Sequence, residues 1–140
     1  MGTPTQYDDI DVGHELGPLE LTLTGEQVKR YAIAARMPGG RFMGDEEARR
    51  EGMPGQMVPG NFSMALLSRL IGEAFPDASL RRLSTTYRAV MYPGRPIRIH
   101  GVVTEKHCTD HGDQLECDLV IEGPDGERLV TGTATVRLPA

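Results

Sequence analysis

Residues 61–75 read NFSMALLSRLIGEAF, and this segment decides how the rest of the chain can fold. As a helix it is apolar over most of its circumference and forms a rod of about 22 Å. That length is too short to cross a membrane, so a helix this hydrophobic is expected to lie inside the protein. Pro76 and Asp77 end the segment.

The second half of the chain is predicted to form strands that wrap around this helix. Apolar and polar residues alternate in four runs, 83–94, 95–107, 115–123 and 128–139. Short turns separate the runs, which predicts a four-stranded antiparallel meander. Gly132 and Ala134 fall on the apolar face of the last run, where their small size would let the helix pack closely.

The first half supplies one short strand and two further helices. Residues 19–23 alternate like a strand that can join the sheet. Thr24 and Gln27 form a capping box that predicts the start of a helix. The predicted fold class is therefore α+β, a single domain over residues 1–140 in which a curled antiparallel sheet wraps around one long buried helix. One strand at the sheet edge remains free, so we expect a dimer.

The composition agrees with one globular domain and excludes several classes of function. The 140 residues are 39% hydrophobic and 25% charged, with a net charge of −5, which supports a core and argues against a nucleic-acid-binding protein. The sequence shows neither a membrane-spanning segment nor a signal peptide, so a cytoplasmic protein is expected. Cys108 and Cys117 fit no metal-ligand spacing and are expected to stay reduced. No metal or cofactor is predicted.

Four motifs carry a resemblance to a known family. They are YDDIDVGHEL at 7–16, VPGNFSMALLSRLI at 58–71, YRAVMYPG at 87–94, and GVVTEK at 101–106 followed by TGTATV at 131–136. In this order they resemble MaoC-like dehydratases, the family of R-specific enoyl-CoA hydratases. The resemblance covers about residues 7–138 and implies a hot-dog fold. It also implies an acyl thioester substrate, carried by CoA or by an acyl carrier protein, and a homodimer or a heterodimer with another hot-dog chain.

The family pattern also implies a catalytic site that this sequence lacks in part. The pattern has an Asp and a His, five residues apart, and a glycine whose backbone N–H binds the thioester carbonyl. A gapless alignment from Tyr31 to Leu66 puts Met37 at the Asp position and Phe42 at the His position, and keeps the glycine as Gly60. Neither replacement can exchange a proton, whereas a helix N-terminus still favours an oxyanion.

The remaining candidates for the site have two interpretations each. Asp45 is either a replacement acid or the cap of a short helix over residues 45–51. Asn61 and Ser63 either cap the long helix or donate hydrogen bonds to a substrate oxygen. The expected substrate-binding residues are those around the glycine and the flexible methionines: Gly60, Asn61, Met37, Phe42, Met57, Val58 and Met64.

Other polar residues have a weaker claim on function. Five arginines, at 81, 82, 88, 95 and 98, surround the first two predicted strands of the meander, either as a solvated face or as an anchor for the phosphates of CoA or phosphopantetheine. His100 and His107 are expected to be surface residues of a strand. The spacing of Asp9 and His14 matches the family pair, but it lies in the wrong part of the chain.

Two functions therefore remain open. The first is lyase-like thioester chemistry with non-standard residues. The second is a non-catalytic binding subunit that pairs with a chain bearing the Asp/His pair. A hot-dog thioesterase is a weaker third hypothesis, because the first acid on the long helix is Glu73, at its far end.

Overall fold

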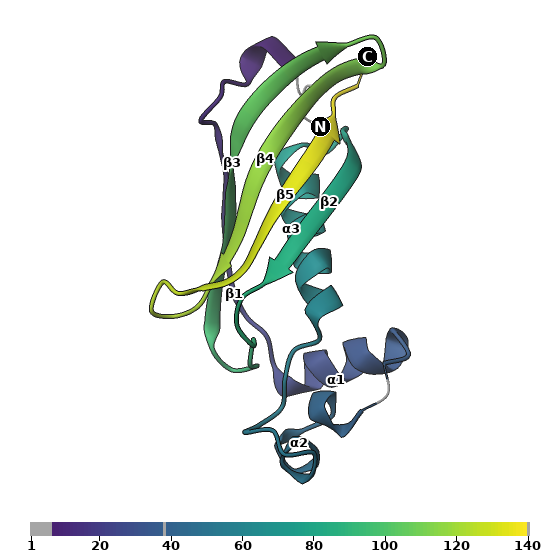
Figure 1. Ribbon diagram of the computed structural model, residues 1–140, viewed down its shortest axis with the longest axis vertical. Helices are drawn as coiled ribbons and strands as arrows, with labels where there is room; N and C mark the ends of the chain where they lie inside the picture. Colours follow the sequence, from purple (N-terminus) through teal and green to yellow (C-terminus); the bar gives the residue numbers. More distant parts are fainter. Residues whose placement is uncertain (1–6, 38, 140) are drawn as a thin grey trace.

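The computed structural model describes residues 7–37 and 39–139 of the chain. The helices are α1 (Gly25–Ala34), α2 (Asp45–Arg50) and α3 (Gly60–Ala74), with short 3-10 turns at Tyr7–Asp9 and Gly40–Phe42. The strands are β1 (Glu15–Thr22), β2 (Ser79–Tyr87), β3 (Pro96–Thr109), β4 (Gly112–Glu122) and β5 (Arg128–Arg137). One sheet packs on α3, while α1 and α2 lie together beyond one end of it (Figure 1), which confirms the predicted α+β class.

The strand order is β1-β3-β4-β5-β2, and all neighbours are antiparallel. The prediction of a four-stranded meander is therefore wrong, because only β3, β4 and β5 follow one another. Residues 88–95 are no tight turn. Val58 N–H donates to the Met91 carbonyl (2.9 Å) and Gly94 N–H donates to the Leu23 carbonyl (2.8 Å). These bonds hold residues 88–95 as a crossing connection. It runs from β2, at one edge of the sheet, to β3, which lies next to the strand at the other edge.

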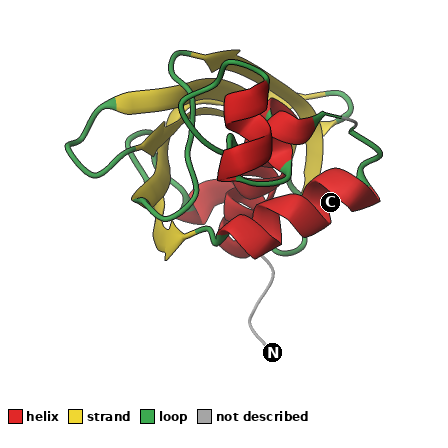
Figure 2. Cartoon of the chain, turned by 90° about the horizontal axis from the view of Figure 1, so that it is seen from below, coloured by secondary structure: helices red, strands yellow, loops and turns green. Residues whose placement is uncertain are grey.

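The face of the sheet that packs on α3, here called the inner face, forms the core. Viewed from below, the sheet curls around the helix (Figure 2). The predicted alternation in β4 is confirmed, since Leu115, Cys117, Leu119 and Ile121 are all buried. A Cβ built on Gly132 would lie at 3.5 Å from Leu67 Cδ1, an ordinary contact distance, and at 3.0 Å from the Ser84 carbonyl oxygen, so the tighter constraint at this glycine comes from β2 and not from α3.

One side of α3 remains uncovered in the single chain. Leu66, Leu67, Leu70 and Ile71 are buried against the sheet. The opposite side exposes Ala65, Arg69, Gly72 and Glu73 to solvent. The expectation of a helix buried over most of its circumference is thus too broad, because the sheet covers one side only.

The ends of the elements follow local chemistry in part. The capping box of α1 is confirmed: Gln27 N–H donates to Thr24 Oγ1 (3.1 Å), and Thr24 N–H donates to Gln27 Oε1 (2.8 Å). Both cysteines are free, as predicted, with Cys108 exposed and Cys117 buried. Of the helices described, none is long and apolar enough to span a bilayer.

Candidate functional site

The predicted site lies where the loop before α3 meets the segments on either side of it. Met57 N–H donates to the Arg41 carbonyl (2.8 Å), and Val58 N–H donates to the Met91 carbonyl (2.9 Å). The loop is therefore held between the 3-10 turn before α2 and the crossing segment after β2. This arrangement determines where Gly60 and the first turn of α3 lie.

Gln56 organises this junction, although its sequence context offers no signal of that role. Its side chain is buried, and Nε2 donates to the carbonyls of Gly25 and Phe42, both at 2.9 Å. Its backbone N–H donates to Asp45 Oδ1 (2.9 Å). One residue thus connects the loop with α1, the 3-10 turn and α2. Buried side-chain amides are usually hydrogen-bonded in this way, because a buried donor without an acceptor would be destabilising.

Asp45 does not cap α2, contrary to the prediction, because Gly44 occupies the N-cap position and Asp45 is the first residue of the helix. Its carboxylate instead accepts the Gln56 N–H. Asp45 also lines a hollow of about 440 Å³ together with Tyr92 and Arg95. Arg95 stacks there, with its guanidinium carbon 4.9 Å from the centre of the Tyr92 ring. This carboxylate has a structural contact that the sequence did not indicate.

Asn61 and Ser63 do not cap α3 either. The N-cap is Pro59, which offers no side-chain hydrogen bond. Ser63 is buried, and its hydroxyl contacts Met91 Sδ at 3.3 Å, so it faces the core. Asn61 is exposed on the first turn. No side chain caps α3, although Phe62 N–H donates to the Pro59 carbonyl (3.0 Å). The positive end of the helix favours an anionic acceptor.

Tyr87 lies directly against Gly60, a contact that no local motif announces. A Cβ built on Gly60 would lie 3.0 Å from Tyr87 Cζ and 3.3 Å from its hydroxyl oxygen. Tyr87 is the last residue of β2, and about half of its surface is exposed. A phenol can donate a hydrogen bond. The start of α3 therefore combines backbone N–H groups with one side-chain donor beside the same glycine.

The other predicted binding residues are apolar and are buried or half-buried. Val58 is buried, and Met37, Phe42, Met57 and Met64 are half-buried. Nearby, the rings of Tyr31 and Phe62 stack with centroids 4.3 Å apart. Thioether and phenyl groups supply apolar contact and do not titrate. Glu73 lies at the far end of α3, where it pairs with Arg69 (3.1 Å).

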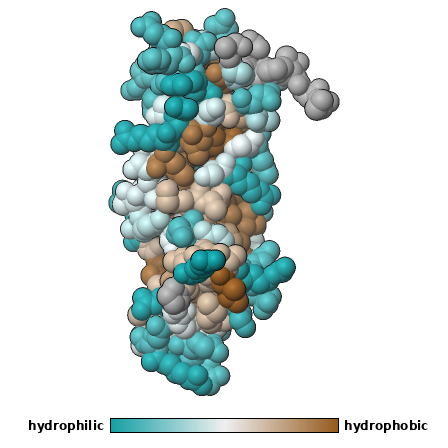
Figure 3. Space-filling view, turned by 90° about the vertical axis from the view of Figure 1, so that its right-hand side faces the viewer, coloured by the Kyte–Doolittle hydropathy of each residue, from teal (hydrophilic) through white to brown (hydrophobic). Residues whose placement is uncertain are grey.

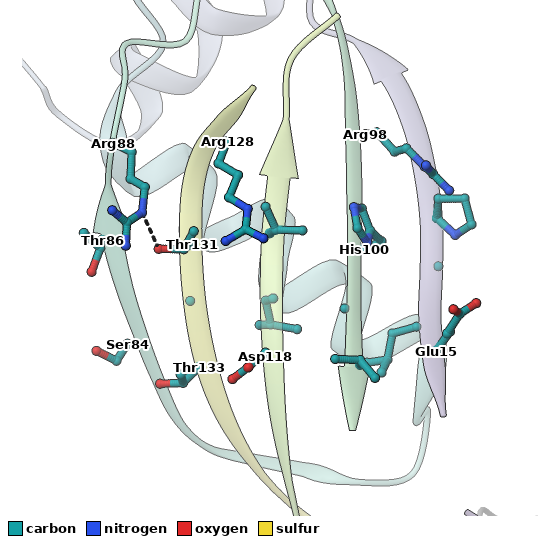
Figure 4. Close-up of a pocket in the computed structure, with 18 residues that line it drawn as sticks. Glu15, Ser84, Thr86, Arg88, Arg98, His100, Asp118, Arg128, Thr131 and Thr133 are labelled. Carbon is teal, nitrogen blue, oxygen red and sulfur yellow. Dashed lines mark hydrogen bonds between the residues drawn. The ribbon is translucent and has the colours of Figure 1, made fainter. Parts of the chain in front are cut away.

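The charged side chains of the sheet gather on its other side, here called the outer face. A hollow of about 820 Å³ lies there, lined by arginines, threonines and acids from every strand (Figure 4). His100 Nε2 pairs with Glu122 Oε1, and Arg98 pairs with Glu20 at 3.8 Å. Within residues 7–37 and 39–139, no group of three His, Cys, Asp or Glu side chains is arranged to hold a metal ion.

The predicted arginine cluster is only partly formed. The interpretation that it surrounds two neighbouring strands is wrong, because β4 and β5 lie between β2 and β3. Arg88 and Arg98 nevertheless line the same outer-face hollow, whereas Arg95 lines the smaller one. Arg81 and Arg82 are exposed on β2, and His107 is an exposed residue beside Glu105 (3.1 Å).

Comparison with known proteins finds similarity in structure but not in sequence. No protein-family model matches the chain, and no curated protein sequence matches it significantly. Solved structures match over nearly the whole chain. The R-hydratase PhaJ1 from Pseudomonas aeruginosa has a TM-score of 0.86 at 16% identity, covering 95% of this chain and 84% of that one.

Two further solved structures that match are a chain of a two-subunit complex and a MaoC-like dehydratase. A chain of the ChsH1-ChsH2 complex from Mycobacterium tuberculosis has a TM-score of 0.80 at 20% identity, covering 92% of this chain and 98% of that one. A MaoC-like dehydratase from Rhodospirillum rubrum has a TM-score of 0.80 at 17% identity, covering 95% and 97%. The resemblance seen in the sequence is thus confirmed at the level of the fold: this chain has the hot-dog fold that MaoC-like dehydratases and R-hydratases share.

Proposed function

We propose that this protein is a MaoC-like acyl-thioester-binding subunit that lacks the usual proton-transfer pair. The observation that carries the proposal is the start of α3, which no side chain caps and where Gly60 lies against the Tyr87 ring. Half-buried Met57 and Met64 lie within four residues of this glycine in the sequence. Such a site can bind a carbonyl and an apolar chain. The two ionisable or hydroxyl candidates have other contacts, since Asp45 accepts the Gln56 N–H and Ser63 faces Met91.

A second hot-dog chain is the proposed partner. The face seen from the β2 side carries a band of apolar residues (Figure 3). Leu80, Tyr87 and Val90 are exposed on or just after this edge strand. An edge strand flanked by apolar side chains is suited to pairing with another sheet. Two of the matched structures are complexes, ChsH1-ChsH2 and HadBC, both from Mycobacterium tuberculosis. A partner carrying the Asp/His pair would supply the missing proton transfer, and a homodimer would not.

Altered thioester chemistry within this chain is the second candidate. Tyr87 supports it, because its hydroxyl lies beside the proposed carbonyl position and is a potential donor. The cytoplasm is the proposed location for either function, since both cysteines are free thiols.

The test separates binding from turnover. The purified chain is expected to bind crotonyl-pantetheine in native mass spectrometry and to show no hydration of crotonyl-CoA. Gly60→Ala should weaken binding, because the new Cβ would press on Tyr87 and cover the helix N-terminus. Gly72→Ala, in open space on the same helix, is the matched control.

Three outcomes would change the proposal. Hydration by the chain alone would exclude a purely binding role, and its loss in Tyr87→Phe would favour the second candidate. Equal binding by Gly60→Ala and Gly72→Ala would place the thioester elsewhere. Absence of any binding would reject both candidates.

A further inference from the structure

Two arginines on the outer face are brought together by an irregularity in the sheet. The register between β4 and β5 shifts after Ile121, so that Glu122 pairs with Arg128 and the chain bulges at Leu129. A bulge inserts one extra residue into a strand and re-aims the side chains next to it. Here it places Arg128 on the outer face together with Thr131, and both line the larger hollow.

The same bulge also holds Arg88 in place. The Leu129 carbonyl accepts the backbone N–H of Arg88 (2.9 Å) and of Ala89 (3.2 Å). Arg88 Nε then donates to Thr131 Oγ1 at 3.1 Å. In Figure 4 the Thr131 hydroxyl lies between the guanidinium groups of Arg88 and Arg128. Both arginines are thus positioned by backbone contacts around one residue, Leu129.

Among the described residues, no carboxylate forms an ion pair with either of these arginines. Glu122 is the cross-strand neighbour of Arg128, but its carboxylate pairs with His100. Arg98, the third arginine of the hollow, pairs with Glu20. In the part of the chain that the structure describes, neither Arg88 nor Arg128 forms an ion pair with a carboxylate. Two guanidinium groups on either side of one threonine, neither of them in an ion pair, favour the binding of an anion.

The acidic residues of the hollow lie at its other end. Asp118 precedes Val120, the cross-strand neighbour of Thr131, by two residues, which is about 7 Å along the strand. Glu15 lies on β1, at the opposite edge of the sheet from Arg88. The hollow is therefore polarised, with a cationic end at Arg88 and Arg128. Ser84 and Thr86 of β2 and Thr133, the cross-strand neighbour of Asp118, add hydroxyl groups to the lining.

We propose that this cationic end binds a phosphate group of a nucleotide-sized ligand. A volume of about 820 Å³ exceeds the need of a single inorganic ion and falls in the range of small-molecule sites. Guanidinium groups match the geometry of phosphate oxygens. Tyr87 contacts Gly60 at the inner side, and the next residue, Arg88, lines the outer hollow, so the two proposed sites are adjacent. This inference rests on the proposed function: one CoA thioester would place its carbonyl at Gly60 and its phosphorylated nucleotide in the hollow.

The experiment uses a probe that carries no thioester. Isothermal titration of the full chain with adenosine 3′,5′-bisphosphate is expected to show binding that weakens about tenfold or more in Arg88→Gln and in Arg128→Gln, the loss typical of one charge-assisted hydrogen bond. Arg49→Gln, an exposed arginine on α2 that lines neither hollow, is the matched control and should bind like wild type. Added salt should weaken binding to the wild type as well.

Two further arms keep the conclusions separate. Absence of binding to the bisphosphate, or equal binding by all variants, would overturn the phosphate site. Thermal unfolding of each variant shows that the exposed substitutions leave the fold intact. Crotonyl-pantetheine, which lacks the nucleotide, should bind the double variant Arg88→Gln/Arg128→Gln as well as wild type. Failure of that ligand with wild type would reject the proposed function, while the bisphosphate result would still decide the phosphate site.

Discussion

The two faces of the sheet differ in chemistry although the same strands build both. The inner face holds residues such as Leu115, Ile121 and Val136, each fully buried, and α3 covers it. The outer face holds threonines, arginines and the pair of His100 with Glu122, open to solvent in the single chain. Alternation along each strand therefore separates apolar from ionisable groups by the thickness of one sheet.

This separation explains the character of the proposed site. The carbonyl position proposed at Gly60 belongs to the start of α3, on the inner side, where the phenol of Tyr87 lies against the glycine. Ionisable side chains such as His100 and Glu122 lie on the outer side. The protein has acid–base residues in the sheet, but the strands direct them away from the start of α3.

Removing inner-face packing should have the largest effect on stability. Leu67 of α3 is fully buried against the sheet, so Leu67→Ala is expected to lower the free energy of unfolding by about 2 to 5 kcal/mol. Thr133→Ala, an exposed outer-face change, should alter it by less than about 0.5 kcal/mol. Urea denaturation measures both. Similar values for the two variants would contradict the contrast between the faces.

Substitution by alanine should lower the stability at Gly101 in the sheet and raise it at Gly72 on the open side of α3. A Cβ on Gly101, in the middle of β3, would lie 2.6 Å from the Asp118 carbonyl oxygen and 2.7 Å from Leu119 Cδ2. Gly101→Ala is therefore expected to cost about 1 to 3 kcal/mol. Gly72 on the open side of α3 has no atom near such a Cβ, so Gly72→Ala should stabilise by about 0.5 to 1 kcal/mol. Thermal unfolding of both variants gives the sign of each effect.

Burial on the inner face should make stability depend on alkaline pH. Burial raises the pKa of Cys117 from 9.0 to about 12, so the folded protein keeps the thiol neutral where the unfolded chain ionises it. The contribution is complete below pH 9 and is lost as pH rises toward 12. At pH 10 the loss, relative to Cys117→Ala, should be about 1.4 kcal/mol. Denaturant unfolding at pH 8 and pH 10 compares the two proteins; parallel curves would show that Cys117 is not buried.

Breaking an exposed ion pair of the outer face should have the smallest effect. Glu20 and Arg98 lie 3.8 Å apart, and more than half of each side chain is exposed. Glu20→Gln is expected to change the free energy of unfolding by less than about 0.5 kcal/mol. Measurements at low and high salt should agree closely. A loss above 1 kcal/mol would show that the outer face also carries packing.

Local patterns predicted the elements but not their arrangement. The capping box of Thr24 and Gln27 and the alternation of Leu115 to Ile121 involve neighbours in sequence, so their outcome needs no knowledge of the rest of the chain. Asp45 shows the limit of this reasoning. Its position favours a helix cap, but its carboxylate instead accepts the backbone N–H of Gln56, eleven residues away. The Arg128 side chain likewise depends on a bulge that no residue type marks.

The sequence by itself determined that a hydrophobic helix must be covered and that alternating strands must cover it, because burial of apolar surface follows directly from periodicity. It also led to the prediction that Met37 and Phe42 stand at the Asp and His positions of the family pattern and that Gly60 keeps its glycine, which stays a prediction. The tertiary structure decided which strands are neighbours, how Gln56 joins the loop to α1, and that Tyr87 lies against Gly60 and Arg88 beside Arg128. These contacts join residues far apart in the chain, and their free energy depends on closing the whole sheet, which no single segment encodes.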